Sequence, residues 1–394
     1  MSTELLINDI KEVSERVRSE STFLVIFSDD GDGISSAAIF SSILEELGKE
    51  YSLVCLDKIF PDALRLIYEH YADMYVYLDL GGPIFLYTPP DLRNRILIVD
   101  HHEEKVLSSN IMYLNPAKYN KTGNYATTSV MTYFIHRAIK GNKTNLSWLS
   151  LIGIGEIEGE FTGLNWAALT DALSLGLAER VVRESKLSLK VKVDSRSREI
   201  KSLYRDITLV SSVNYYYDGP LSAVEALIFK DIDFVKKLID KAKQKRMEAF
   251  TKCLKYLESE GLFQLKNVQW FKDIGFFEDM GTRVFDSFTS FIRFQSRLLN
   301  RRKYILGLMN RRSKIPGLGS VKGRWINIAI RVPKYLETLI LAGKFQPVSA
   351  LAEAAAFQVD GIGYGYPHIG SAVIPEGSED LFISIFNEML SEEK

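Results

Sequence analysis

The feature that most constrains the fold is a set of four short apolar runs in the first 100 residues, each ending in or beside a polar or acidic residue. The runs are Phe23–Ser28, Ser52–Asp57, Tyr75–Leu80 and Ile96–Asp100. Their β-branched and aromatic residues are typical of buried parallel strands. After the first run, Ile34–Leu47 carries apolar residues at helical spacing, and Gly48 follows as a stop signal. Strand, helix and strand in this order predict a doubly wound, mainly parallel α/β sheet.

The rest of the chain predicts a first domain over residues 1–215, a helical connector over 216–261 and a second, smaller α/β domain over 262–394. Residues 126–177 have a mostly apolar helical pattern. A long helix is predicted over Phe234–Glu260, with Gly261 as its stop signal and a lysine-rich face that we interpret as solvated. The second domain is predicted to contain a strand at Trp325–Val332 and helices at Tyr335–Ala342, Ser349–Phe357 and Asp380–Leu390.

Composition excludes several classes of protein. The 394 residues include 49 basic and 50 acidic side chains, so any affinity for nucleic acid must come from a local patch. The two cysteines, Cys55 and Cys253, provide neither a disulfide framework nor a cysteine-based zinc site. No apolar run reaches the roughly 18 residues that a membrane span requires. We therefore expect a soluble protein of the cytoplasm with no membrane partner.

Acidic residues follow three of the predicted strands. Asp30, Asp32, Asp79 and Asp100 should meet at the carboxyl edge of the sheet, where ligands bind in such folds. Two of the chain's five histidines, His101 and His102, follow directly. Oxygen ligands brought together in this way suit Mg²⁺ or Mn²⁺. The alternative is a set of solvated turns with surface histidines. Without a metal, the four carboxylates would repel one another and oppose folding.

These residues resemble the motifs of the DHH phosphoesterase superfamily. Asp30-x-Asp32-Gly33, Asp79 and Asp100-His101-His102 are similar to its motifs I, II and III. Near the C-terminus, Gly363-Tyr364-Gly365-Tyr366-Pro367 is similar to the Gly-Gly-Gly-His-Pro signature of the DHH-associated domain. The resemblance spans nearly the whole chain. It implies a RecJ-like arrangement of a DHH domain, a helical linker and a nucleic-acid-binding domain.

The resemblance also implies positions for two metal ions. The ligands of the first ion in active members correspond to Ser28, Asp30 and Asp79. A histidine ligand is therefore replaced by Ser28. The ligands of the second ion correspond to Asp32, Asp79, His101 and, with Glu158 as a competitor, Glu156. His102 would face the substrate phosphate.

The second domain departs further from the family pattern. Tyr366 replaces the phosphate-contacting histidine, Tyr364 replaces a glycine, and Ala329-Ile330-Arg331 keeps only the arginine of a Ser-x-Arg motif. Catalytic constellations tolerate only about 0.5 Å of looseness. These departures predict that no catalytic set is intact, with His102 and Asp100 vestigial and no cofactor required. If the metal site is still used, the implied ion is Mn²⁺ or Mg²⁺.

A basic stretch, Arg293–Arg324, holds ten Lys or Arg and no acidic residue in 32 positions. Such a stretch, interleaved with aromatic residues, is a candidate for binding the backbone of single-stranded DNA. The candidate contacts, with the arginine of the second domain's strand included, are Arg301, Arg302, Lys303, Arg311, Arg312 and Arg331. The alternatives are a solvated loop and a contact with an acidic protein partner.

The favoured interpretation is a catalytically degenerate RecJ-like protein. It resembles the archaeal replication factor that joins the MCM ring and the GINS complex in the replicative helicase, and acts there as a scaffold. The first alternative is a metal-dependent 5′→3′ single-strand exonuclease or phosphodiesterase. The second alternative is a pyrophosphatase-like or oligoribonucleotide-cleaving member of the superfamily, which the long connector and the basic stretch disfavour.

Overall fold

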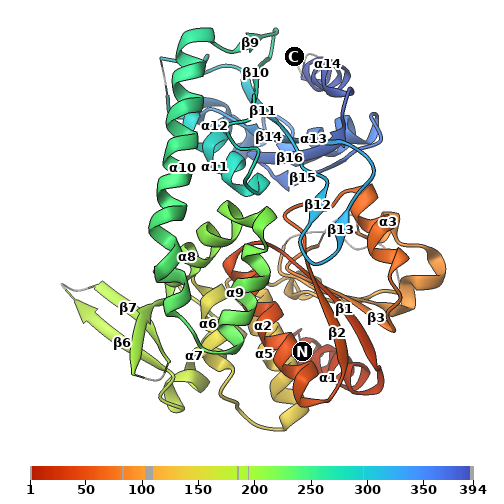
Figure 1. Ribbon diagram of the computed structural model, residues 1–394, viewed down its shortest axis with the longest axis vertical. Helices are drawn as coiled ribbons and strands as arrows, with labels where there is room; N and C mark the ends of the chain where they lie inside the picture. The colour runs from red at the N-terminus through yellow and green to blue at the C-terminus, as the bar shows by residue number, and fades with distance from the viewer. Residues whose placement is uncertain are drawn as a thin grey trace.

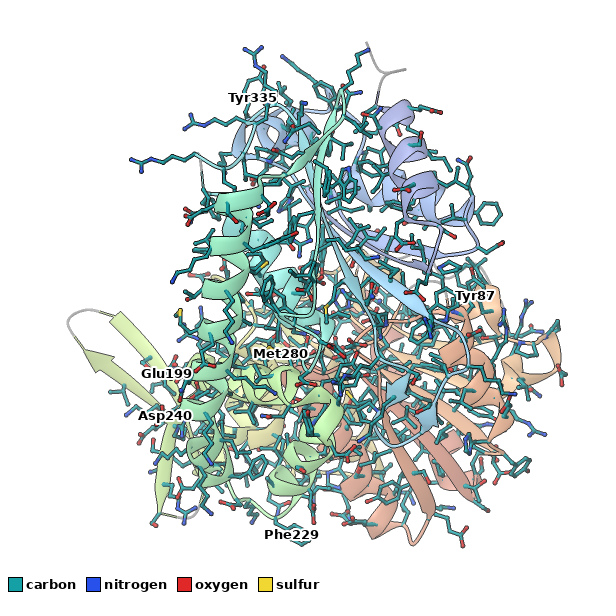
Figure 2. The ribbon with its side chains drawn as sticks, turned by 45° about the horizontal axis from the view of Figure 1, so that its top comes forward. Tyr87, Glu199, Phe229, Asp240, Met280 and Tyr335 are labelled. Atoms are coloured by element: carbon teal, nitrogen blue, oxygen red, sulfur yellow. The ribbon has the colours of Figure 1, made fainter. Side chains whose placement is uncertain are left out.

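The computed structural model describes residues 2–81, 84–102, 110–183, 186–193, 195–295 and 297–390. Two units, each built around one sheet, lie one above the other, and the long helix α10 runs along the side of both (Figure 1). The first unit comprises the elements from α1 to α9, and the second comprises those from β9 to α14. In Figure 2, Phe229 and Tyr335 mark the outer ends of the two units, and Met280 lies between them.

The first unit contains the predicted parallel sheet, in the order β2-β1-β3-β4-β5. The four predicted strands are present, and a short fifth strand joins them. Their bounds are β1 Thr22–Phe27, β2 Glu50–Cys55, β3 Met74–Leu78, β4 Ile96–Val99 and β5 Met112–Leu114. The sequence analysis missed β5 because three residues carry too little periodicity to be recognised.

Helices cover both faces of this sheet. One face packs against a group that includes α2, and the other packs against α3 and α4. The helices are α1 Ser2–Ser19, α2 Gly31–Glu46, α3 Pro61–Glu69, α4 Ile84–Tyr87, α5 Thr128–Lys140, α6 Ser147–Ile154, α7 Gly163–Ser174, α8 Ile200–Val213 and α9 Gly219–Ile228, with short 3₁₀ turns at Pro90–Arg95, Pro116–Tyr119 and Tyr215–Tyr217. The central helix α2 is buried almost all round. Ser35, Ser36 and Ser42 are tolerated there because they donate to carbonyls one turn back, as Ser36 Oγ does to the Asp32 carbonyl at 2.7 Å.

A small antiparallel sheet projects from the side of the first unit (Figure 1). Its strands are β6 Ala178–Arg183, β7 Lys186–Val193 and β8 Arg196–Glu199. The sequence analysis did not predict it. The strands are dense in charged residues, and among their described side chains those of Ala178, Val191 and Val193 are buried against the core. No helix in the described part of the chain is long and apolar enough to cross a membrane.

The long predicted helix is confirmed as α10, Asp233–Glu260, and it ends at Gly261, whose φ of 75° favours glycine. The preceding helix α9 packs against α2, although the predicted connector began at residue 216. The domain boundaries at residues 215 and 261 stay a prediction.

The second unit is built on a mixed sheet in the order β15-β16-β14-β11-β10-β9. Only β10 and β11 are parallel. The bounds are β9 Phe263–Gln264, β10 Val268–Lys272, α11 Thr282–Ile292, β11 Tyr304–Asn310, β14 Trp325–Arg331, α12 Lys334–Leu341, α13 Val348–Phe357, β15 Ile362–Tyr366, β16 Ile369–Pro375 and α14 Glu379–Met389. The predicted strand and three helices are therefore confirmed as β14, α12, α13 and α14. In β14, Ile326, Ile328 and Ile330 face the core under these helices, and the alternate residues face α11.

Residues 311–324 form an arm that reaches from the second unit to the edge of the first sheet (Figure 1). The arm contains the hairpin of β12 Lys314–Ile315 and β13 Gly319–Ser320. The Cys55 N–H donates to the Pro316 carbonyl at 3.1 Å, so the arm hydrogen-bonds to edge strand β2. A side chain at Gly317, whose φ is 80°, would collide with the Leu53 carbonyl. The arm therefore joins the two units.

A buried ion pair fixes the base of the arm. Arg311 Nη2 donates to Asp57 Oδ1 at 2.5 Å, and the two side chains are 4% and 0% exposed. The Thr282 N–H, at the start of α11, donates to the other oxygen of Asp57 at 2.9 Å. Burial alone would raise the pKa of Asp57, but Arg311 and Thr282 lower it below its ordinary value.

Arg311→Met should reduce the free energy of unfolding by about 3–5 kcal/mol, because it leaves Asp57 buried without its cation. Since the folded pKa of Asp57 is lowered, the wild type keeps the contribution of this pair above about pH 4 and loses it at more acid pH. Denaturant unfolding at several pH values measures both effects. The double variant Asp57→Asn, Arg311→Met should recover part of the loss.

The control is Arg324→Met. It removes an arginine of the same arm that is 85% exposed and lies 3.5 Å from Glu376. Exposed pairs contribute little, so this variant should unfold like the wild type. Equal stability of the Arg311 variant and this control would contradict a clamping role for the buried pair.

Candidate functional site: an acidic cluster at the sheet edge

The structure brings the predicted acidic and histidine residues together at the carboxyl edge of the parallel sheet. They are Asp30, Asp32, Asp79, Asp100, His101, His102 and Glu156. The side chains of His102 and Glu156 are about one-third exposed, and the others are buried. Glu158, the competitor of Glu156, is exposed, whereas Glu156 Oε1 lies 3.5 Å from His101 Nε2. The geometry therefore favours Glu156 over Glu158 as the motif IV carboxylate.

Asp30 caps helix α2. Its Oδ1 accepts from the Asp32 N–H at 3.1 Å and from the Gly33 N–H at 3.0 Å. Its Oδ1 also lies 3.0 Å from Ser28 Oγ. A side chain at Gly33 would collide with Ser28, so the glycine is required for this turn. The turn holds Asp30 in one orientation.

Asp32 is held by the beginning of helix α5. The Thr128 N–H donates to Asp32 Oδ2 at 2.9 Å, and the Ser129 N–H donates to Oδ1 at 3.0 Å. A carboxylate at a helix N-terminus is stabilised by these donors and by the helix dipole. A side chain at Gly153 would collide with both Asp32 and Ser129. The charge of Asp32 is thus partly compensated within the protein by these two donors.

Asp79 shares a proton network with Ser28. Ser28 Oγ lies 2.7 Å from Asp79 Oδ2 and 3.0 Å from Asp30 Oδ1. A hydroxyl carries one proton, so both contacts are hydrogen bonds only if one carboxyl is protonated. Burial, followed by the charges of Asp30 and Asp32, raises the pKa of Asp79 well above its ordinary value. Protonated Asp79 can therefore donate to Ser28, which donates to Asp30.

The two histidines lie with their rings stacked, 4.6 Å apart. His101 Nδ1 is 3.3 Å from Asp32 Oδ2 and 3.5 Å from Asp79 Oδ1. Burial opposes its charged form, but the carboxylates of Asp32 and Glu156 raise the pKa of His101 well above its usual value. His102 Nδ1 donates to Asp100 Oδ1 at 2.7 Å, and Asp100 raises the pKa of His102 to about 10 despite burial. The charged form of both imidazoles is therefore favoured when no metal is bound.

The second unit contributes a cation that the sequence analysis missed. Arg283, near the start of α11, donates from Nε to Asp29 Oδ1 at 2.8 Å and lies with Nη2 3.0 Å from Asp30 Oδ2. Burial raises the pKa of Asp29 to about 6, although Arg283 opposes this shift. Arg283 is some 250 residues from Asp29, and nothing in the sequence pairs them. The only available signal was the cluster of carboxylates at Asp29 and Asp30, which requires a cation from some other part of the chain.

The donor set fits one metal ion better than two. Ligand atoms of Asp32, His101 and Glu156 lie within 4.8 Å of one another, and so do those of Asp79, His101 and His102. Carboxylate oxygens with an imidazole nitrogen suit Mn²⁺ or Mg²⁺. At the first-ion position, Asp30 is already bound by Arg283 and Ser28, and no nitrogen ligand stands at residue 28. This half of the site does not fit a metal ion.

The β15–β16 hairpin of the second unit lies over this site. Tyr366, 48% exposed, has its ring centroid 6.3 Å from that of His102. The side chain of Tyr364 is half-buried, and the Lys58 ammonium lies 5.2 Å from its ring centroid. A side chain at Gly363 would collide with the backbone of α13. The tyrosines therefore face Lys58 and His102, where the family's signature would meet phosphate.

Three of the predicted nucleic-acid contacts are engaged within the protein. Arg311 is held by Asp57, as described, and Arg312 pairs with Asp279. Arg331 is buried, and it donates to Ser290 Oγ at 2.7 Å and to the Gly370 carbonyl at 3.0 Å. Arg311 and Arg331 are therefore buried and tie elements together, whereas Arg312 keeps 39% of its side chain exposed beside Asp279. Arg301 and Arg302 are exposed, and Lys303 is half-buried.

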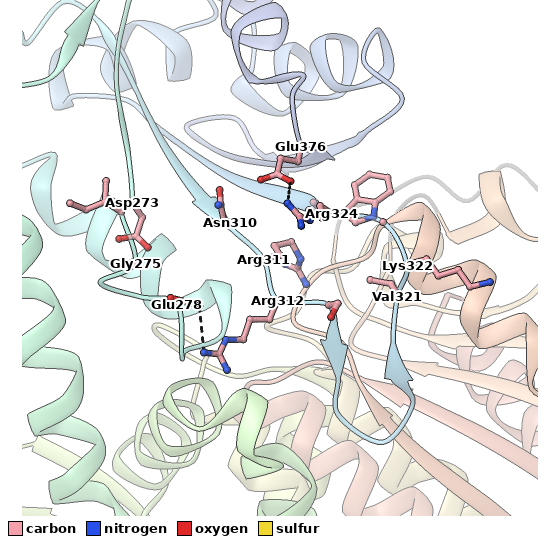
Figure 3. Close-up of a pocket in the computed structure, with 14 residues that line it drawn as sticks. Asp273, Gly275, Glu278, Asn310, Arg311, Arg312, Val321, Lys322, Arg324 and Glu376 are labelled. Carbon is pink, nitrogen blue, oxygen red and sulfur yellow. Dashed lines mark hydrogen bonds and ion pairs between the residues drawn. The ribbon is translucent and has the colours of Figure 1, made fainter.

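A separate pocket of about 610 Å³ lies at the base of the arm (Figure 3). Its lining includes Arg312 and Arg324, which face Glu278 and Glu376 at 3.6 Å and 3.5 Å. None of the predicted metal ligands lines it. It is distinct from the acidic cluster.

The acidic cluster should bind a single Mn²⁺ ion, because Arg283 and Ser28 occupy the other half of the site. Isothermal titration should give at most one ion per chain for the wild type and for Ser28→His. The double variant Ser28→His, Arg283→Gln should bind a second ion, since it adds a nitrogen ligand and frees Asp30.

Circular dichroism and thermal melts verify that the variants fold. Two ions bound by the wild type would show that Arg283 does not block the first position. A double variant that folds but gains no second ion would show that the loop geometry has also diverged.

Comparison with known proteins matches one part of the chain to a family and the whole chain to a fold. Residues 22–155 match the DHH family, N-terminal domain. No curated protein matches the sequence significantly. Among solved structures, RecJ of Thermus thermophilus in complex with Mn²⁺ aligns with a TM-score of 0.61 and 14% identity, covering 98% of this chain and 55% of that one. The chain thus spans about half the length of that RecJ.

Two further structures share the fold over nearly their full lengths. Exonuclease RecJ bound to manganese has a TM-score of 0.60 and 13% identity, and 98% of this chain and 94% of that chain are covered. CDC45 from Entamoeba histolytica has a TM-score of 0.54 and 12% identity, and 98% of each chain is covered. Residues 22–155 therefore match the DHH family, N-terminal domain, and the chain as a whole has a RecJ-like fold.

Proposed function

We propose that this chain is a catalytically degenerate RecJ-like protein that acts as a DNA-replication scaffold with the MCM helicase and the GINS complex. The observation that carries the proposal is the position of Arg283. Its guanidinium binds Asp29 and Asp30, where the first metal ion of an active member would be held. The Arg283 guanidinium neutralises the charge of this turn, but it is not the Lewis acid that metal-dependent phosphodiester hydrolysis requires.

Further observations support loss of catalysis with retention of the fold. Ser28 stands in place of a nitrogen ligand and hydrogen-bonds to two carboxyl groups. Tyr366 stands in place of the phosphate-contacting histidine. The likeness to CDC45, the eukaryotic RecJ-like replication factor, covers 98% of both chains and supports a replication role. A scaffold of this kind requires no cofactor.

The second candidate function is a metal-dependent 5′→3′ single-strand exonuclease or phosphodiesterase. It is favoured by Asp32, Asp79, His101 and Glu156, which retain ligand atoms at one ion's position. A Mn²⁺ ion there would polarise a phosphate oxygen, while His102 lies at the mouth of the site. The argument against this function is that Arg283 takes the place of the other ion, and two-metal hydrolysis uses that ion to stabilise the leaving group.

Mn²⁺-dependent cleavage should be absent or at least about 10³-fold slower than that of an active RecJ, because one of the two ion positions is occupied by Arg283. Single strands labelled at either end, incubated with Mn²⁺ or Mg²⁺, measure this rate. Asp79→Ala is the control for contaminating nuclease. Robust cleavage that disappears in Asp79→Ala would reject the scaffold proposal in favour of the enzyme.

Partner capture tests the scaffold directly. The full-length tagged chain, incubated in native extract, should retain MCM and GINS subunits, which mass spectrometry identifies. An active RecJ of similar size, used as bait, is the matched control and should not retain them. Recovery of neither complex by the folded bait would contradict the proposal.

A further inference from the structure

An apolar surface lies open to solvent between helix α10 and the end of α11. Phe250 of α10 is half-buried, and its ring centroid lies 5.2 Å from that of Phe288 in the core and 5.9 Å from that of Phe291, which is 39% exposed. Met247, 60% exposed, and Leu254, half-buried, lie one turn before and one turn after Phe250 on the same side of α10. We call Met247, Phe250, Leu254 and Phe291 the α10–α11 patch.

The patch follows the axis of α10 for about two turns. It is separate from the side of α10 that packs on the core, where Ala249, Cys253 and Leu257 are buried. Helix α10 runs along the outer side of both units (Figure 1), so another protein can approach it. Apolar side chains at helical spacing form a ridge against which a second helix packs with its own apolar face.

Basic side chains border the patch. Residues 243–258, which extend it by about one turn at each end, contain two acidic residues and five cations. Lys243 lies one turn before Met247 on the same side of α10, and Arg246 Cζ lies 5.8 Å from the ring centroid of Phe250. None of the five cations forms an ion pair with a described residue; they are Lys243, Lys245, Arg246, Lys252 and Lys255. The local field at the patch is therefore positive and favours an acidic partner.

We propose that the α10–α11 patch is the docking surface for an amphipathic helix of a partner protein, apolar on one face and acidic on its flanks. The apolar face of this helix packs on the patch, and its carboxylates meet Lys243 and Arg246. Nucleic acid fits less well, because Met247 and Leu254 have no flat face on which a base could stack. The inference rests on the proposed scaffold role only for the identity of the protein that carries the helix.

A designed peptide tests the surface without that protein. The probe is a fluorescein-labelled helix of about 20 residues, with leucines at helical spacing on one face and glutamates on the flanks. A second peptide has lysines in place of the glutamates. Fluorescence anisotropy should show that the wild type binds the glutamate peptide at least about ten-fold more tightly than the lysine peptide. Equal affinities, or no binding of the glutamate peptide up to about 1 mM, would overturn the proposal.

Met247→Glu should weaken binding of the glutamate peptide at least about ten-fold, because it places a negative charge within the patch. The matched control is Leu381→Glu, since Leu381 is 56% exposed in α14, on the other side of the second unit from α10 (Figure 1). This control should bind like the wild type, and circular dichroism verifies that both variants fold. Wild-type affinity in Met247→Glu would assign the peptide to another surface and reject the patch.

The charge requirement is tested by reversing one cation. Lys243→Glu should weaken binding of the glutamate peptide and strengthen that of the lysine peptide. Lys237→Glu makes the same change at an exposed position on another side of α10 and should have the smaller effect on both. Equal effects of the two variants would contradict a contact at Lys243. Displacement of the glutamate peptide by unlabelled oligo(dT) from the wild type, but not from Met247→Glu, would make nucleic acid the occupant and reject the proposal.

Capture from native extract separates this inference from the proposed function. When the wild-type bait retains MCM and GINS, Met247→Glu should lose at least one of them, and Leu381→Glu should retain both. Retention of both by Met247→Glu would show that they dock elsewhere and would reject the patch as the scaffold's docking surface. If the wild-type bait retains neither, the proposed function fails, and the peptide affinities alone decide whether the patch binds an acidic helix.

Discussion

The constraint on which the rest of the structure depends is the burial of six aspartates at the carboxyl edge of one parallel sheet. They are Asp29, Asp30, Asp32, Asp57, Asp79 and Asp100. Carboxylates brought together out of water oppose folding unless cations or hydrogen-bond donors accompany them. The protein provides such groups at each position, through the start of α5, the hydroxyl of Ser28, two charged histidines and two arginines.

Both arginines come from the second unit, so compensation of charge also joins the two halves of the molecule. Arg283 reaches the turn before α2, and Arg311 reaches Asp57 at the end of β2. Lys58 makes the reverse contact, because it extends from the first unit to Asp286 of α11 at 2.9 Å. A metal ion would neutralise the same edge without fixing the units. Arg283 neutralises part of this edge and at the same time joins the two units.

The basic stretch shows the same distinction between charge used inside the protein and charge left for a partner. Its C-terminal half forms the arm, where Arg311, Arg312 and Lys314 pair with aspartates of other elements. Its middle part leaves Arg301 and Arg302 exposed and without an ion pair among the described residues. The sequence does not show whether a Lys or Arg is paired within the protein or left for a partner. Only the positions of the acidic residues around it in the folded structure distinguish the two cases.

The sequence by itself determined the elements whose signals are local. Apolar runs gave β1 to β4, helical spacing gave α2 and α10, and the strand ends placed Asp30, Asp79 and Asp100 at one edge, because parallel strands end together. Strands β6 to β8 were not predicted, since their many charged residues leave few apolar positions to form a recognisable pattern. Tertiary structure alone decided that Arg283 lies against Asp29 and Asp30, and that Arg311 and Arg331 face inward. These contacts join residues distant in the chain, and no local periodicity or spacing encodes which side chain will meet a given charge after folding.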